Sequence, residues 1–407
     1  MNNFQQNVRL WWQPPRRTSD REAERRVTFL ELFYDLVYVV VIAEVSHALA
    51  GHVDRQGILE FGLLFVLVWV AWINGTFYHE LHGNNDIRTR VFTFLQMFTV
   101  AMMAVFAHNA FGEGGAGFAL SFAAYQLVLT YLWWRTGVYD PLHRPLAQPY
   151  VLNYLISTVL FVTSAFVPEA WRTYFWLTSL ILSVSGPLIT VLFAPSDPEV
   201  QAEQERSRAA TDSLVERFGL FIIIVLGEVI VAVVRGVAAH HGLDLTIFLT
   251  AGLGMLLAVG LWWLYFDFVS QRLPVASNWG VPFWIYLHLF VAMGIVATGA
   301  ATLNVVEHAS EPLGAVVTWL LTGALALAMG TIALLLLLLR LPEAFQPLYR
   351  RGALITLLAA AGCAALGFTT LPAIPLLTAL VVLLLLPVIY GIHVWITVLG
   401  GREFTVD

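Results

Sequence analysis

The chain has 407 residues and a formal net charge of −6; 59% of the residues are hydrophobic, 12% are charged, and the mean hydropathy is +0.76. Soluble domains usually carry about 25% charged residues, so the composition excludes an ordinary soluble protein. The single cysteine, Cys363, also excludes an intrachain disulfide and a cysteine zinc site.

Long apolar runs recur along the whole chain and predict an all-α polytopic membrane protein. A membrane helix needs about 20 apolar residues, and dividing the chain at polar, Gly and Pro breaks gives about twelve spans. In chain order they are 27–49, 57–78, 90–111, 116–138, 150–167, 171–193, 214–236, 245–269, 280–303, 312–339, 352–368 and 373–399.

The spans fall into two six-helix halves. We expect an Arg-rich cytoplasmic arm at 1–26, a first half at 27–194, a polar cytoplasmic linker at 195–213, a second half at 214–399 and a cytoplasmic tail at 400–407. Every basic residue is arginine, and cytoplasmic loops are enriched in Lys and Arg. With both termini in the cytoplasm, all arginines except Arg55, Arg172 and Arg235 fall on the cytoplasmic side.

The two halves show faint internal similarity. Span 1 reads ELFYDLVYVVVIAE from Glu31 to Glu44, and span 7 reads ERFGLFIIIVLGE from Glu216 to Glu228. Tryptophan pairs recur in spans 2 and 8 in the same order. Because six is an even number, the second half enters the membrane from the same side as the first, so the predicted repeats are parallel.

Span 1 carries Glu31, Asp35, Glu44 and His47, although an acidic residue near a helix centre costs about 2.5–3.5 kcal/mol to insert. At 100° per residue, Glu31 and Asp35 share one face, and Glu44 and His47 lie on nearly the opposite one. A helix that is polar on two faces is expected to be surrounded by protein or to border a wet cavity.

Two interpretations of these carboxylates stay open. Glu44 and Glu228 could form a pseudo-symmetric acidic pair that binds a proton or cation, or they could be packing residues that are neutral or hydrogen-bonded. Glu31 and Asp35 could belong to the same pathway, or they could form salt bridges at the interface and stabilise a helix N-terminus.

The remaining candidates are Asp267 in span 8, which could face a cavity or reach the cytoplasmic interface, and His288 in span 9, which could join a proton relay or form an interhelical hydrogen bond. His79 and His82 have the i, i+3 spacing of a metal pair, but no third ligand is in sight, so we expect no metal and no cofactor. No phosphate-binding loop, HExxH or G-x-S-x-G motif occurs, so ATP-driven transport would need another subunit. No nucleophile and base can be paired from the sequence, so enzymatic activity is not expected.

The segment from Arg26 to His47, RVTFLELFYDLVYVVVIAEVSH, strongly resembles the bacterial low temperature requirement protein A (LtrA) family. The span count and Gly227-Glu228 extend this resemblance over residues 25 to 400. It implies a bacterial inner-membrane protein linked to growth in the cold, and it implies no particular substrate. A looser similarity is to a potassium-channel family with six-span repeats, where Phe33 and Asp35 would match a signature in the first helix.

These features favour a secondary transporter coupled to protons or cations. One alternative is an oligomeric cation channel lined by spans 1 and 7, and another is a non-transporting scaffold or lipid-adaptation protein. The expected partners are membrane lipids and a small solute or ion, with homo-oligomerisation left open and no nucleic acid involved.

Overall fold

The computed structural model describes residues 11, 13–17, 25–192, 197–242 and 244–398, without the side chains of 186–192. Parts of the predicted arm (1–10, 12 and 18–24), two linker residues (195–196) and the predicted tail (400–407) lie outside the described residues. The described helices are α2 (Phe29–Gly51), α3 (Arg55–His82), α4 (Ile87–Ala107), α5 (Gly115–Tyr139), α6 (Arg144–Ala165), α7 (Glu169–Leu192), α8 (Pro198–Arg208), α9 (Asp212–Ala238), α10 (Leu245–Phe268), α11 (Gly280–Glu307), α12 (Ala315–Leu338), α13 (Gln346–Leu366) and α14 (Ala373–Thr397).

Each predicted span overlaps one of the long helices. Among the described residues, nine helices are long and apolar enough to cross a membrane. These are α3, α4, α5, α6, α9, α10, α11, α12 and α14; the long helices α2, α7 and α13 fall outside this set. An all-helical, multi-pass membrane protein is therefore confirmed.

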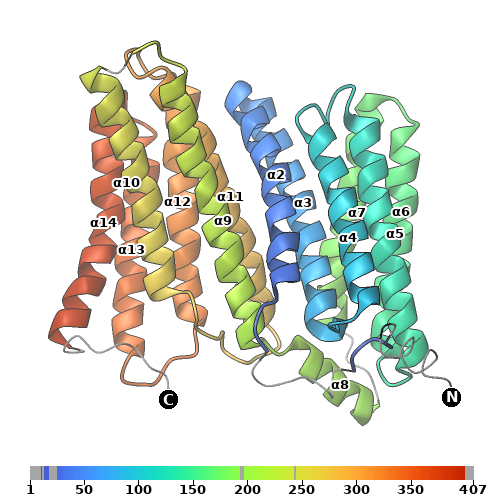
Figure 1. Ribbon diagram of the computed structural model, residues 1–407. Helices are drawn as coiled ribbons and strands as arrows, with labels where there is room; N and C mark the ends of the chain where they lie inside the picture. The colour runs from blue at the N-terminus through green and yellow to red at the C-terminus, as the bar shows by residue number, and fades with distance from the viewer. Residues whose placement is uncertain (1–10, 12, 18–24, 193–196, 243, 399–407) are drawn as a thin grey trace. The chain divides into compact units, whose positions relative to one another are not determined.

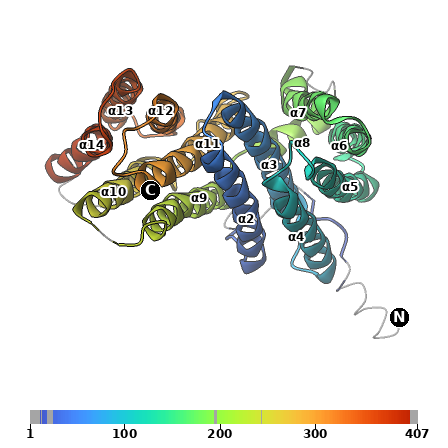
Figure 2. The ribbon, with the colours of Figure 1, turned by 90° about the horizontal axis from the view of Figure 1, so that it is seen from above.

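The chain forms two compact units. Unit 1 comprises residues 1–48 and 60–214, and unit 2 comprises residues 49–59 and 215–407. In unit 1, α5 packs against α4 and α6, and α6 packs against α7 (Figure 1). In unit 2, successive helices α11 to α14 pack against one another, and α10 packs against both α14 and α11, which closes a ring (Figure 2).

Aspartate side chains cap the N-termini of several helices. Asp86 precedes α4 and accepts a hydrogen bond from the Thr89 backbone N–H. Asp244 caps α10 in the same way, through the Ile247 N–H. These bonds satisfy backbone donors that have no partner within the helix, and each typically stabilises a helix by about 1 kcal/mol.

The predicted linker contains a helix of its own. Helix α8 begins after Asp197, whose side chain accepts from the Glu199 N–H, and it lies at one end of unit 1 (Figure 1). Its residue Glu203 is buried and lies 3.1 Å from Nδ1 of His143, just before α6. This contact fixes part of the linker against unit 1.

Candidate functional site

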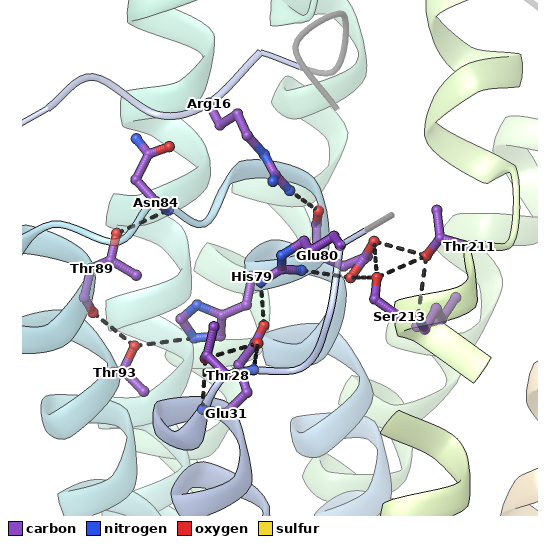
Figure 3. Close-up of polar contacts among 12 residues, drawn as sticks. Arg16, Thr28, Glu31, His79, Glu80, Asn84, Thr89, Thr93, Thr211 and Ser213 are labelled. Carbon is purple, nitrogen blue, oxygen red and sulfur yellow. Dashed lines mark hydrogen bonds and ion pairs between the residues drawn. The ribbon is translucent and has the colours of Figure 1, made fainter. Parts of the chain in front are cut away.

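A buried network surrounds Glu80, near the end of α3 (Figure 3). Arg25 donates to Glu80 Oε2 at 2.7 Å. The Thr211 hydroxyl donates to Oε1 at 2.8 Å, and the Ser213 hydroxyl lies 2.9 and 2.8 Å from the two carboxylate oxygens. Arg16 donates to the backbone carbonyl of Glu80. We call these residues, together with Glu31, the Glu80 cluster.

Glu31 joins the cluster through the start of α2. Its Oε1 accepts from Arg25 at 2.5 Å, and its Oε2 accepts from the Thr28 N–H at 2.9 Å. The Thr28 hydroxyl in turn accepts from the Glu31 N–H at 3.3 Å. This reciprocal pattern is a capping box, which satisfies donors at a helix N-terminus. For Glu31, the geometry is that of a salt bridge and a helix cap.

The Glu80 cluster is electrically balanced, because it contains two arginines and two glutamates. One guanidinium, that of Arg25, bridges the carboxylates of Glu31 and Glu80. Both carboxylates are at least 95% buried, and a buried charge is tolerated when it is paired and hydrogen-bonded. The cluster therefore joins Arg16 and Arg25 of the arm to α2, α3 and the first turn of α9, and it is suited to a structural role.

Further polar groups lead from this cluster into the interior of unit 1. His79, beside Glu80, lies 3.0 Å through Nε2 from the Gln96 side-chain oxygen on α4. The Tyr34 ring lies edge-on to the His79 imidazole, with centroids 5.6 Å apart. The Tyr34 hydroxyl lies 3.0 Å from that of Tyr38 and 2.8 Å from that of Tyr125 on α5.

We call Tyr34, Tyr38 and Tyr125 the tyrosine chain. All three residues are fully buried, and the Tyr125 hydroxyl donates to the Ala71 carbonyl at 2.6 Å. Gly75 on α3 makes the arrangement possible, because a Cβ there would overlap the Tyr34 and Tyr125 hydroxyls. Hydroxyl groups both donate and accept hydrogen bonds, so the chain has the chemistry of a proton relay.

Asp35 is the most deeply buried of the predicted site residues, with an exposed fraction of 0%. Its Oδ1 accepts a hydrogen bond from the Trp72 indole N–H at 2.8 Å. Trp72 belongs to α3 and is itself fully buried. Asp35 is thus held inside unit 1, away from the helix cap formed by Glu31.

Glu44 and His47 lie toward the other end of α2. The Glu44 side chain is 39% exposed, and its carboxylate lies 4.0 Å from Nδ1 of His108. His47 is half-buried. Glu44 is therefore the most accessible of the three carboxylates on this helix.

The predicted residues of unit 2 have separate surroundings. Glu228 on α9 is 6% exposed. His288 is buried on α11, with Nε2 3.0 Å from the Tyr265 hydroxyl and Nδ1 2.7 Å from the Trp284 carbonyl. Asp267 is exposed and accepts from the Trp263 indole N–H at 2.6 Å. The local contacts of His288 and Asp267 account for their placement.

Sequence reasoning missed the central position of Glu80. It singled out His79 and His82 around Glu80, and the structure directs these histidines to different partners, Gln96 and the Arg16 carbonyl. In the described part of the chain, no group of three or more His, Cys, Asp or Glu side chains could hold a metal ion. The i, i+4 spacing of Tyr34 and Tyr38 was the one local signal of the tyrosine chain.

Comparison with known proteins identifies the family. The sequence profile of the family described as Bacterial low temperature requirement A protein (LtrA) matches residues 26–392. A curated relative, the Uncharacterized protein RA0937 of Rhizobium meliloti (strain 1021), is 26% identical over 287 residues, which cover 68% of each chain. The resemblance first drawn from the start of span 1 is thereby confirmed, and the chain belongs to the LtrA family.

Proposed function

We propose that this protein is a secondary transporter coupled to protons or cations, with Asp35 as its coupling residue in unit 1. The burial of Asp35 in α2 carries the proposal. An ionisable residue inside a membrane helix is expensive to insert, and it commonly marks an ion pathway or a proton relay. Trp72 holds one oxygen of Asp35 in a fixed direction, which suits a group that must bind and release a cation repeatedly.

Other buried polar groups in unit 1 support a path for protons or a small solute. The tyrosine chain begins at Tyr34, one residue before Asp35, and extends to α5. Gln126, beside Tyr125, is fully buried, and neither atom of its side-chain amide has a hydrogen-bond partner within the described residues. Buried polar atoms of this kind need a further partner such as water or a bound solute.

Glu228 is a candidate for a second acidic site, in unit 2. It is 6% exposed on α9, the first long helix of that unit. The order of packing is also alike, because α4 to α7 of unit 1 and α11 to α14 of unit 2 each pack in succession. These likenesses support our proposal that the units arose by duplication as parallel six-helix repeats.

We also propose that the protein lies in the bacterial inner membrane with both termini in the cytoplasm. The arginine distribution supports this orientation, because nearly all arginines then lie on the cytoplasmic side. The family description supports a link to growth in the cold.

Proteoliposomes test the proposal and separate it from a channel. The purified protein would be reconstituted, and fluxes of protons, monovalent cations and a panel of small solutes would be followed with and without an imposed pH gradient. For a transporter, we expect slow flux that saturates with solute concentration and depends on the pH gradient. Unsaturated ion currents without proton coupling would favour the channel, and flux equal to that of empty liposomes would favour a scaffold.

A further inference from the structure

Arg88, the second residue of α4, presents a buried guanidinium whose donors are not used. Its exposed fraction is 1%, and in the described part of the chain none of its three side-chain nitrogens has a hydrogen-bond partner. A guanidinium carries five N–H donors. Burying charged donors without acceptors is costly, so Arg88 calls for a further, negatively charged partner.

Asp86 lies within ion-pair distance of Arg88 but accepts no hydrogen bond from it. Its Oδ2 lies 3.7 Å from Arg88 Nε, which is too far for a hydrogen bond. The same Oδ2 accepts from the Gln13 N–H at 2.9 Å, and Oδ1 accepts from the Thr89 N–H and hydroxyl at 3.0 and 2.6 Å. Asp86 therefore caps α4 and lowers the local positive charge without occupying the donors of Arg88.

A second buried guanidinium lies close by. Arg135 on α5 is 6% exposed and interacts electrostatically with Arg88. The Tyr78 side chain of α3 interacts with both arginines. Because like charges repel in a buried setting, an anion beside Arg88 would reduce the repulsion from Arg135 and would accept from the donors of Arg88.

The surroundings place this arginine pair at the depth of lipid headgroups. Tyr131, Trp134 and Tyr139 on the last turns of α5 are 36%, 54% and 51% exposed. Exposed Trp and Tyr residues at the end of a membrane helix are typical of the membrane–water interface. The Arg135 guanidinium lies 5.0 Å from the centroid of the Tyr139 ring. Basic pockets between helices at this depth are suited to phosphate headgroups.

We propose that Arg88 and Arg135 form a binding site for a phosphate-type oxyanion, contributed by an anionic lipid headgroup or by free inorganic phosphate. The planar guanidinium fork matches two phosphate oxygens at once. The site is distinct from the Glu80 cluster, whose charges are already paired, and its existence does not depend on transport activity.

Thermal unfolding of the purified full chain in dodecyl maltoside, a detergent without phosphate, tests the site. Phosphatidylglycerol, phosphatidylcholine or inorganic phosphate would be titrated into wild type, Arg88→Gln and Arg90→Gln. Arg90 is the matched control, because it is exposed on the same helix turn and bonds to the Asn85 side chain at 3.0 Å.

We expect wild type and Arg90→Gln to be stabilised alike, and Arg88→Gln to bind about tenfold more weakly or worse, since a charged hydrogen bond is lost. Stabilisation by phosphatidylglycerol but not by inorganic phosphate would identify a headgroup, and the reverse would identify free phosphate. Equal responses of Arg88→Gln and wild type, or no response of wild type to either probe, would overturn the proposal. If Arg88→Gln does not fold, Arg135→Gln takes its place in the same comparison.

Discussion

Replacing Glu80 with glutamine is expected to destabilise unit 1 strongly. The substitution keeps the shape of the side chain but removes the charge that accepts from Arg25 at 2.7 Å and from the hydroxyls of Thr211 and Ser213. Glu80 is 1% exposed, and Arg25 is only 15% exposed in its side chain. Removing one partner of a buried ion pair typically costs about 3–5 kcal/mol. Because Glu31 still pairs with Arg25, we expect about 3 kcal/mol.

Unfolding in mixed micelles of increasing SDS content measures this loss as a free energy. Glu113→Gln is the control, because Glu113 is exposed in the loop after α4. A double-mutant cycle with Arg25→Gln should give a coupling of about 1.5–3 kcal/mol, as expected for a charged hydrogen bond. A change of less than about 0.5 kcal/mol for Glu80→Gln, with strict additivity in the cycle, would refute the structural role of the Glu80 cluster.

Two further substitutions test the capping box and the tyrosine chain by the same SDS measurement. Thr28→Ala should cost about 1 kcal/mol, because it removes the hydroxyl that caps α2, whereas Thr28→Ser should be close to wild type; equal stability of all three proteins would contradict the cap. Gly75→Ala should cost about 1–3 kcal/mol, because its Cβ would overlap the Tyr34 hydroxyl. Gly62→Ala on the same helix is the control, because a Cβ at this position has no atom within 4 Å and should leave the stability unchanged or raise it. Similar losses of stability in both variants would argue against close packing at Gly75.

The sequence predicted the helices well because apolar runs are a strong local signal. The errors in the predicted helix ends follow from the same signal, because an apolar run marks only the part of a helix that lies in the hydrocarbon core of the membrane. The apolar run predicts span 2 at 57–78, yet α3 continues through the polar residues to His82. The predicted 352–368 likewise missed the first turns of α13, which begins at Gln346 and includes two arginines.

The candidate site could be predicted only in part. The carboxylates of α2 were evident, since charges are rare in membrane helices. The partners of Glu80 were not, because Thr211 lies 131 residues away and Ser213 lies 133 residues away in the sequence. The position of Tyr125 opposite Tyr34, 91 residues apart, also depends on tertiary packing. Likewise, the sequence places Arg88 in a loop before the predicted span 3, whereas the structure shows that its side chain is buried.

The most direct test of the transport proposal compares wild type with Asp35→Asn in proteoliposomes that contain a pH-sensitive dye. Asparagine keeps the size of the side chain and an oxygen that the Trp72 indole can still donate to, but it cannot carry a negative charge. We expect wild type to move protons or cations above the level of empty liposomes, and we expect Asp35→Asn, folded and inserted to the same extent, not to do so. Equal flux through both proteins would contradict the role of Asp35 as the coupling residue.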